Sequence, residues 1–206
     1  KAGSDYSLTY QNNVNVGSAT IQVNGLNGYK DVKKSVSFTI TAYPAANLKI
    51  KADSKKVYTG KMIKPVPVVT HDNTKLREGR DYTVSYSGNK MIGTAKITIR
   101  GIGNYAGSKA VTFTIIPKAP EKLKLKKSGA NGITLRWKKV KGASGYYVYR
   151  STAKNGKYRK VKTLNKAGMV SYRAANLKKN KKYYYYVKAF KKVKNKKIES
   201  NRSKVV

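Results

Sequence analysis

The sequence predicts an all-β chain built from tandem antiparallel β-sandwiches. Apolar and polar residues alternate over short segments along all 206 residues, and turn residues separate these segments about every 8–12 positions. One stretch of the first half recurs later in the chain, which indicates at least two modules of one kind. No stretch has the apolar period of about 3.6 residues that an amphipathic helix needs.

The recurring stretch defines the strands of two modules. Gly3–Tyr29 aligns with Gly79–Tyr105, 76 positions later, and Phe38–Ile40 aligns with Phe113–Ile115, 75 positions later. In both copies every second residue is apolar, which is the pattern of a strand with one buried face. The residues that predict the first two strands of each copy are Tyr6, Leu8, Tyr10, Ala19, Ile21 and Val23, with their counterparts Tyr82, Val84, Tyr86, Ala95, Ile97 and Ile99.

Two similar linkers divide the chain. TITAYPAANLKIK at 39–51 and TIIPKAPEKLKLK at 114–126 each end a strand, pass through proline and alanine, and open the next module. Proline cannot donate to a sheet ladder and it stiffens the joint. We therefore expect boundaries near 46/47 and 118/119. The resulting modules are 1–46, 47–118 and 119–206.

The first module lacks half of the second. Nothing in 1–46 corresponds to residues 57–70, VYTGKMIKPVPVVT, which we expect to supply the opening strands of the second module. We therefore interpret 1–46 as the C-terminal half of a truncated repeat. On this interpretation the chain is a piece of a longer array.

The third module does not share the repeat but has the same strand pattern. Ile133, Leu135 and Trp137 alternate with polar residues. Tyr146 and Val148 alternate with two further tyrosines, and the tyrosine-rich segment 183–189 alternates in the same way. Short strands of this kind indicate an antiparallel sandwich.

The residue inventory excludes most catalytic chemistry. The chain has no cysteine and one histidine, and 46 lysines and arginines stand against 8 acidic residues, a formal net charge of +38. Thiolate metal sites, cysteine nucleophiles and multi-histidine metal sites are excluded, and carboxylate pairs are scarce. We predict that the chain is not an enzyme and binds no metal or cofactor. No apolar run reaches the roughly 20 residues of a membrane helix.

The charge is concentrated in the third module. Residues 119–206 hold 28 basic and 2 acidic side chains, whereas 1–118 hold 18 and 6. Such an excess favours an anionic neighbour, which can be nucleic acid, a membrane surface or an acidic polymer.

The third module resembles a fibronectin type III domain. The resemblance rests on GITLRWKKVKGASGYYVYR at 132–150, with Trp137 where the family has a tryptophan on its second strand, and on Leu177 six residues before Tyr183, the family's tyrosine-corner spacing. Lys179-Asn180 replaces the family's usual Pro-Gly. The lysine- and tyrosine-rich composition is similar to modules in surface proteins of Gram-positive gut Firmicutes.

Residues 47–118 resemble bacterial immunoglobulin-like repeats of the MBG/YDG type, and 1–46 resembles the second half of one. The strings GxDYxVxY and GxAxIxIxGxGNYxG carry this resemblance. It implies tandem immunoglobulin-like β-sandwiches, the last one fibronectin type III-like. It also implies an extracellular location, at a bacterial cell surface or wall, in a secreted protein.

Two short motifs have a chemical alternative that we set aside, and a third is structural. His71-Asp72 is the only adjacent histidine and carboxylate, but it follows a predicted strand and we expect a turn. GIGNYA at Gly101–Ala106 imitates a dinucleotide fingerprint, but a strand follows it instead of a helix. Asp5 and Asp81 each stand two positions after a turn glycine, where a carboxylate accepts backbone hydrogen bonds.

A lysine–tyrosine surface of the third module is the best candidate site. If its third and sixth strands pair, four tyrosines point outward from one sheet beside a lysine, and a lysine run follows in the loop after the sixth strand. Such a surface can stack on sugars or bases while its charge holds anions, or it can simply cover and stabilise an exposed sheet. The candidate residues are Tyr147, Tyr149, Tyr184, Tyr186, Lys178, Lys179, Lys181, Lys182, Lys188, Lys191, Lys192, Lys194, Lys196 and Lys197.

Three functional hypotheses are compatible with the sequence. The leading hypothesis is a non-catalytic spacer and adhesion region that associates with anionic wall polymers such as teichoic acids and contacts other domains of its own polypeptide. The second is an adhesin module that binds carbohydrates or host glycans through the tyrosines. The third is nucleic-acid binding, which is disfavoured because no nucleic-acid-binding fold signature is present.

Overall fold

The computed structural model describes residues 1–206. Apart from two short 3₁₀ turns, its regular elements are strands, so the predicted all-β class of tandem sandwiches is confirmed. The chain forms two compact units, the first holding Lys1–Ala52, Val66–Ser85 and Ile97–Val111 and the second holding Asp53–Pro65, Tyr86–Lys96 and Thr112–Val206. None of its helical turns could span a bilayer.

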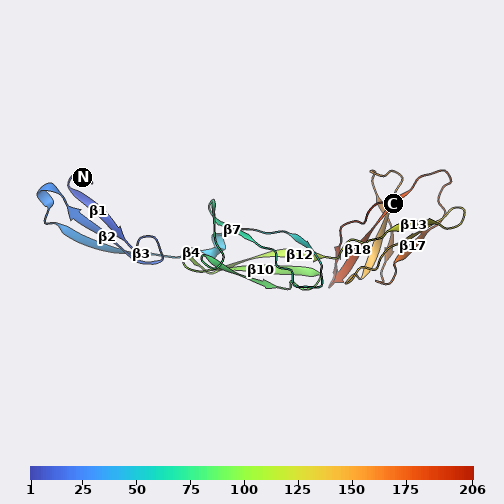
Figure 1. Ribbon diagram of the computed structural model, residues 1–206, viewed down its shortest axis with the longest axis horizontal. Coiled ribbons are helices and arrows are strands. Elements are labelled where there is room, and N and C mark those ends of the chain that lie inside the picture. Colours follow the sequence, from blue (N-terminus) through green and yellow to red (C-terminus); the bar gives the residue numbers. More distant parts are fainter. The chain divides into compact units, whose positions relative to one another are not determined.

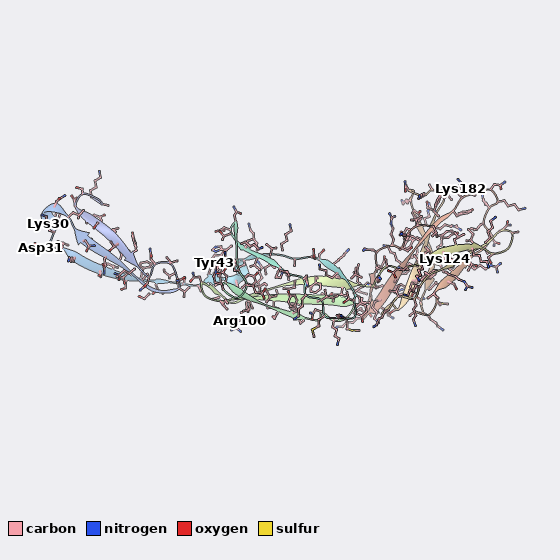
Figure 2. The ribbon with its side chains drawn as sticks, in the orientation of Figure 1. Lys30, Asp31, Tyr43, Arg100, Lys124 and Lys182 are labelled. Atoms are coloured by element: carbon pink, nitrogen blue, oxygen red, sulfur yellow. The ribbon has the colours of Figure 1, made fainter.

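The first unit begins with a three-stranded antiparallel sheet, drawn in blue in Figure 1. Its strands β1 (Tyr6–Gln11), β2 (Gly17–Gly25) and β3 (Lys33–Ile40) lie in chain order. The 3₁₀ turn η1 (Asn27–Tyr29) follows β2, and Lys30 and Asp31 lie between it and β3 at the turn labelled in Figure 2. The predicted strands of the first repeat copy are therefore present.

Two small sheets also lie in the first unit. One has the order β5-β7-β8, and in the other β4 pairs in parallel with β11. The 3₁₀ turn η2 (Ala45–Asn47) joins β4 to β5. The strand bounds are Tyr43–Pro44 for β4, Lys49–Lys51 for β5, Val68–His71 for β7, Thr74–Lys75 for β8 and Tyr105–Ala106 for β11.

A four-stranded sheet of order β6-β12-β10-β9 contains the second copy of the repeated strands. Strand β6 pairs with β12 in parallel. On β10 and β12 the predicted inward residues are buried, among them Ile97, Ile99, Phe113 and Ile115. The bounds are Lys55–Val57 for β6, Tyr82–Ser87 for β9, Gly93–Gly101 for β10 and Ser108–Ile116 for β12.

The second unit ends in a sandwich of two antiparallel sheets, seen at the C-terminal end of the ribbon in Figure 1. Their strand orders are β13-β14-β17 and β16-β15-β18-β19. The first sheet consists of β13 (Lys124–Lys127), β14 (Ile133–Arg136) and β17 (Ser171–Ala174). The second consists of β15 (Gly145–Ser151), β16 (Arg159–Leu164), β18 (Tyr184–Val193) and β19 (Lys196–Glu199).

The core of this sandwich consists of the residues that the alternation predicted to point inward. Leu135 and Trp137 lie on or just after β14, and Tyr146, Val148 and Tyr185 lie on the facing sheet. Trp137 meets the Tyr146 ring edge to face, with centroids 5.3 Å apart. Burial of these side chains fixes which face of β15 and β18 points outward, and so it positions the candidate surface.

The turn before β18 is held by the predicted tyrosine corner. The Tyr183 hydroxyl accepts a hydrogen bond from the Lys178 backbone N–H at 3.2 Å. Leu177, six residues before Tyr183, is buried in the core. This corner anchors the chain as it enters the second sheet.

Candidate functional site

The four candidate tyrosines lie on the two central strands of the β16-β15-β18-β19 sheet. Strands β15 and β18 pair antiparallel, with Tyr149 opposite Tyr186 and Tyr147 opposite Lys188. Tyr184 lies at the start of β18, opposite Ser151. Because directly opposite residues share a face, these side chains all lie on the outer face of the sheet. The predicted strand pairing is confirmed, and the binding role of the face stays a prediction.

The aromatic rings of this face contact one another. Tyr149 stacks on Tyr186 with centroids 4.7 Å apart and planes 22° apart. Tyr158, from the segment that leads into β16, lies 4.8 Å from Tyr186 in a tilted arrangement. Tyr147 stacks on Phe190 at 4.6 Å. Neighbouring rings therefore already cover part of the ring surface of Tyr147, Tyr149 and Tyr186 that a sugar or base could use.

Tyr147 is not the exposed side chain that the sequence predicted. Only 5% of it is exposed, although it points away from the sandwich core. Phe190 stacks on its ring, and the ammonium groups of Lys160 and Lys197 lie 4.4 and 5.6 Å from its centroid. The lysine stems cover apolar surface while their charged ends reach water, so neighbouring side chains bury Tyr147.

Two more cations lie over the same face. The Lys188 ammonium lies 5.8 Å from the Tyr149 ring and forms an ion pair with Glu199 at 3.1 Å. The Arg202 guanidinium lies 5.9 Å from the Tyr186 ring. Cation–π contacts at these distances are weak individually, about 0.5–1 kcal/mol each at exposed sites. Their sum holds the lysine and arginine heads above the rings.

Tyr149 is the most perturbed titratable group of this face. Burial, and then the nearby Glu199 carboxylate, raise the pKa of its hydroxyl to about 12. The hydroxyl therefore stays protonated at neutral pH. Since a protonated phenol is neither a base nor a nucleophile there, Tyr149 contributes contact area and no acid–base chemistry.

The lysine run that follows the tyrosines forms a hairpin instead of the predicted loop. Strand β18 continues to Val193 and β19 begins at Lys196, so only two residues form the turn. Lys194 in that turn has a φ of 51°, a left-handed conformation that tight hairpin turns require. Val193 and Ile198 alternate with the lysines, and this period of two extends the strands through the basic run.

The hairpin places like charges directly opposite each other. Lys192 lies directly opposite Lys197 on the neighbouring strand. The adjacent Lys191 lies opposite the uncharged Ile198. Opposed like charges weaken a sheet, and an anion between them would relieve that repulsion. Lys192, Lys194, Lys196 and Lys197 are exposed. These residues form a dense group of ammonium ions at one end of β18.

The other predicted lysine group lies at the opposite end of β18. Lys178, Lys179, Lys181 and Lys182 are exposed in the loop before that strand, where Figure 2 labels Lys182. Strand β18 has 10 residues, a length of about 30 Å at roughly 3.3 Å per residue. The structure therefore does not bring the two lysine groups together, and one short ligand cannot bridge them.

Four residues of the outer face were missed by the sequence prediction: Tyr158, Lys160, Phe190 and Arg202. Phe190 stands four positions after Tyr186 on the same strand, so the period of two could have identified it. The other three come from a neighbouring strand, its lead-in segment and the tail after β19, and no local pattern marks them.

The motifs that we set aside are structural. His71 ends β7, and Asp72 begins the two-residue turn to β8. The His71 ring stacks on Tyr43 at 3.8 Å and lies 3.3 Å, through Nδ1, from the Tyr105 hydroxyl. The GIGNYA segment runs from the last residue of β10 through a turn at 102–104 into β11. No group of three histidine, cysteine or acidic side chains could hold a metal ion.

The carboxylates that follow the turn glycines accept hydrogen bonds as predicted. Asp81 accepts the Arg77 backbone N–H at 2.8 Å and two bonds from the Arg80 guanidinium. These bonds, with that from Arg80 foremost, hold the pKa of Asp81 below its ordinary value. At the equivalent position Asp5 accepts the Ser4 hydroxyl and contacts the chain's amino terminus.

Comparison with known proteins gives one family match. Residues 118–206 match the family model described as the fibronectin type III domain. None of the curated proteins matches the chain.

Solved structures with similarity include an Fn3-like protein from Clostridium thermocellum, 30% identical over 43% of this chain and 88% of that one, with a TM-score of 0.38. A fibronectin type III domain of human collagen XX is 22% identical over 43% of this chain and 88% of that one, with a TM-score of 0.32. A two-domain fibronectin type III segment of chicken tenascin is 11% identical over 98% of this chain and 99% of that one, with a TM-score of 0.43.

Proposed function

Residues 118–206 belong to the fibronectin type III family, and on this premise we propose that the chain is a non-catalytic, extracellular spacer region. We further propose that it belongs to a bacterial cell-surface or secreted protein and consists of modules 1–46, 47–118 and 119–206. The first two would be immunoglobulin-like repeats of the MBG/YDG type. Fibronectin type III domains are generally structural modules that hold other domains apart, and the proline-containing linkers support that role here.

The proposed partner is an anionic wall polymer held by the lysines of the third module. The observation that carries this proposal is the imbalance of charge: 28 basic and 2 acidic side chains lie in residues 119–206. The two carboxylates, Glu121 and Glu199, form ion pairs with Lys118 and Lys188. The two exposed lysine groups described above are thus left without neutralising carboxylates, and phosphates of a teichoic-acid-like polymer can supply the charge.

Contact through lysines is favoured over contact through tyrosines. The rings of Tyr149 and Tyr186 stack on each other, and Tyr147 is covered by Phe190 and two lysines. A carbohydrate module that stacks on sugars needs a free ring face. The outer face offers ammonium groups above the rings, so it suits a repeating anion better than a neutral glycan.

A repeating polymer also suits the distance between the two lysine groups. Each exposed contact is weak, because ions screen charges beyond about 8 Å at physiological salt. A long polyanion can reach both ends of β18 at once, and the second contact then occurs at a high effective concentration. The expected binding is therefore salt-sensitive and dependent on polymer length.

The test is binding to purified glycerol-phosphate teichoic acid by calorimetry at about 50, 150 and 500 mM salt. Replacing the five hairpin lysines by glutamine is expected to weaken binding at least tenfold. Those residues are Lys191, Lys192, Lys194, Lys196 and Lys197. The matched control removes five exposed lysines elsewhere and is expected to weaken binding less than threefold. Those residues are Lys33, Lys34, Lys49, Lys51 and Lys75.

Four outcomes would contradict the proposal. Equal losses in both variants would show that only total charge matters. Binding that survives 500 mM salt would show that charge is not the attraction. Selective binding to uncharged sugars on a glycan array would favour an adhesin, and tighter binding to duplex DNA than to teichoic acid would favour a nucleic-acid partner.

A further inference from the structure

The β1-β2-β3 sheet has one apolar face and one polar face. Tyr10 lies opposite Ile21 and Ile21 opposite Val36, while Leu8 lies opposite Val23. Directly opposite residues share a face, so these side chains form an apolar surface, in which Lys34, opposite Val23, is the one charged residue. The intervening positions form the other face and are polar: Ser7, Thr9, Thr20, Gln22, Asn24, Ser35, Ser37 and Thr39. Such clean alternation is typical of a sheet that buries one side.

Much of this apolar face is exposed in the structure, although Ala19 on the same face is buried. Leu8 is 40% exposed, Tyr10 51%, Val36 51% and Phe38 37%. An exposed apolar surface of this kind marks an interaction site.

In the second repeat copy several of the equivalent apolar residues are buried. Phe113, the counterpart of Phe38, is 2% exposed, and Ile97 and Ile99, the counterparts of Ile21 and Val23, are fully buried. The second copy differs from the first by the preceding segment, residues 47–76. That segment supplies the β5-β7-β8 sheet and β6, and its Leu48, Val69 and Leu76 are buried as well.

The contacts of β6 define a register for that segment on the first copy. Lys55 pairs with Thr114 and Val57 with Ile116, in parallel. The Thr114 backbone N–H donates to the Ser54 carbonyl at 2.8 Å. The counterpart of Thr114 is Thr39 on β3, which is an edge strand of its sheet. The edge of β3 is therefore the position at which an equivalent parallel strand would add.

A side-chain bond supports the same register. The Tyr86 hydroxyl donates to the Pro65 carbonyl at 2.9 Å, and Tyr86 corresponds to Tyr10 of the first copy. Tyr10 is half exposed, so its hydroxyl is available to an incoming carbonyl at the matching position. Main-chain pairing at β3 and this hydroxyl would fix the orientation of the partner.

We propose that the apolar face of the β1-β2-β3 sheet is a docking surface for a half-repeat, a segment with the sequence pattern of residues 47–76. The segment adds a parallel strand to β3 at Thr39, and its apolar side chains, the equivalents of Leu48, Val69 and Leu76 among them, cover the apolar face. The mode is strand addition, in which main-chain bonds supply affinity and alternate side chains supply specificity. This inference is independent of the proposed polyanion binding.

The test is a fusion that places a second copy of residues 47–76 directly before Lys1. No linker is needed, because Lys1 corresponds to Arg77 in the 76-residue alignment. Hydrogen exchange measured residue by residue is expected to slow at least tenfold at the Thr39 amide. Fluorescence of an apolar dye such as ANS, which reports exposed apolar surface, is expected to fall.

The matched control is the same fusion with V69D and L76D in the added copy alone. It keeps the length and the strand-forming segments but places two charges against the apolar face. Thr39 exchange and dye fluorescence are expected to stay at the values of the unfused chain. Slowed exchange in this control would overturn the proposal, because any attached segment would then suffice.

A second measurement covers the case in which the fusion folds poorly. Phe38→Ser is expected to lower the denaturation midpoint of the fusion more than that of the unfused chain, because Phe38 is 37% exposed in the unfused chain and would be covered in the fusion. Equal shifts of the midpoint in the two chains would overturn the proposal. So would sedimentation of the unfused chain as a dimer that protects Thr39, because a second copy of this face would then be the occupant.

Discussion

The rings of Tyr149 and Tyr186 stack face to face across β15 and β18, with centroids 4.7 Å apart. The two residues are direct cross-strand partners, and both lie on the outer face of their sheet. Tyr158 packs against the Tyr186 ring, and the Arg202 guanidinium lies over that ring. These ring contacts form a second layer of side-chain packing on the outer face of the sheet, and we expect this layer to stabilise the sheet.

Replacing Tyr149 by alanine tests whether this outer layer stabilises the fold. The expected loss is about 2–4 kcal/mol in free energy of unfolding, since a half-buried aromatic is removed. A double-mutant cycle with Tyr186→Ala should give a coupling of about 0.5–1.5 kcal/mol. Urea denaturation followed by Trp137 fluorescence measures both. Tyr184→Ala is the control, because Tyr184 lies on β18 with Tyr186. A loss of unfolding free energy as large as that of Tyr149→Ala would show that the stack contributes nothing special to stability.

The raised pKa of Tyr149 predicts a loss of stability in alkali. Burial and Glu199 raise this pKa to about 12 from an ordinary value near 10. A group whose pKa is raised by folding stabilises the protein below the unfolded pKa, and that contribution fades as pH rises from 10 through 12. The denaturation midpoint of the chain should therefore fall over this range, and that of Tyr149→Phe should fall less.

Absorbance at 295 nm provides an independent check of the same titration. The wild-type curve should contain a component near pH 12 that is missing from Tyr149→Phe. Burial also raises the pKa of Tyr146 and Tyr185, so some late titration should remain in the variant. Superimposable curves from the two proteins would refute the assignment.

The tyrosine corner provides a prediction for the loop that carries the first lysine group. Tyr183→Phe removes the acceptor of the Lys178 N–H but keeps the ring beneath Arg150, whose guanidinium lies 5.3 Å from its centroid. A lost hydrogen bond of this kind costs about 1 kcal/mol. The Lys178 amide should exchange faster, as hydrogen exchange by NMR would show. Tyr184→Phe is the matched control and should leave that amide unchanged.

The order of the strands and their faces could be predicted from the sequence, because burial imposes a period of two. The alternation in Tyr6, Leu8 and Tyr10 predicted both β1 and the apolar side of its sheet. The 76-residue repeat predicted β9 from the same pattern. The tyrosine-corner spacing predicted that the Tyr183 side chain would hold a turn.

The contacts of the outer face could not be predicted in this way. A period of two says which face Tyr147 occupies, but not that Lys160 and Lys197 cover it. Those lysines come from other strands, and their positions depend on the register of β16 and β19. The basic run 191–197 was predicted to lie in the loop after the sixth strand, whereas the structure places most of it on β18 and β19. Val193 and Ile198 alternate within that run, so the strands continue through it.

The two aspartates that follow turn glycines provide a matched pair for the last prediction. Asp81 has a side chain only 12% exposed and holds Arg77 and Arg80, whereas the Asp5 side chain is 47% exposed. Asp81→Ala leaves the Arg77 N–H without its acceptor and should cost about 1–3 kcal/mol. Asp5→Ala should cost less stability than Asp81→Ala, because water can replace the contacts of the exposed Asp5 carboxylate. Thermal denaturation at neutral pH compares the two variants.

The stability lost in Asp81→Ala should depend on pH if the Asp81 carboxylate acts as a charged acceptor, and should not depend on pH if Asp81 only fills space. Arg80 holds the pKa of Asp81 below its ordinary value, so this carboxylate stabilises the fold above about pH 4, its unfolded pKa. The contribution is lost as pH falls through the lower folded pKa. The difference in stability between the wild type and Asp81→Ala should therefore narrow as the pH falls below about 4. A difference that stays constant over this range would show that the charge of Asp81 contributes nothing to the turn.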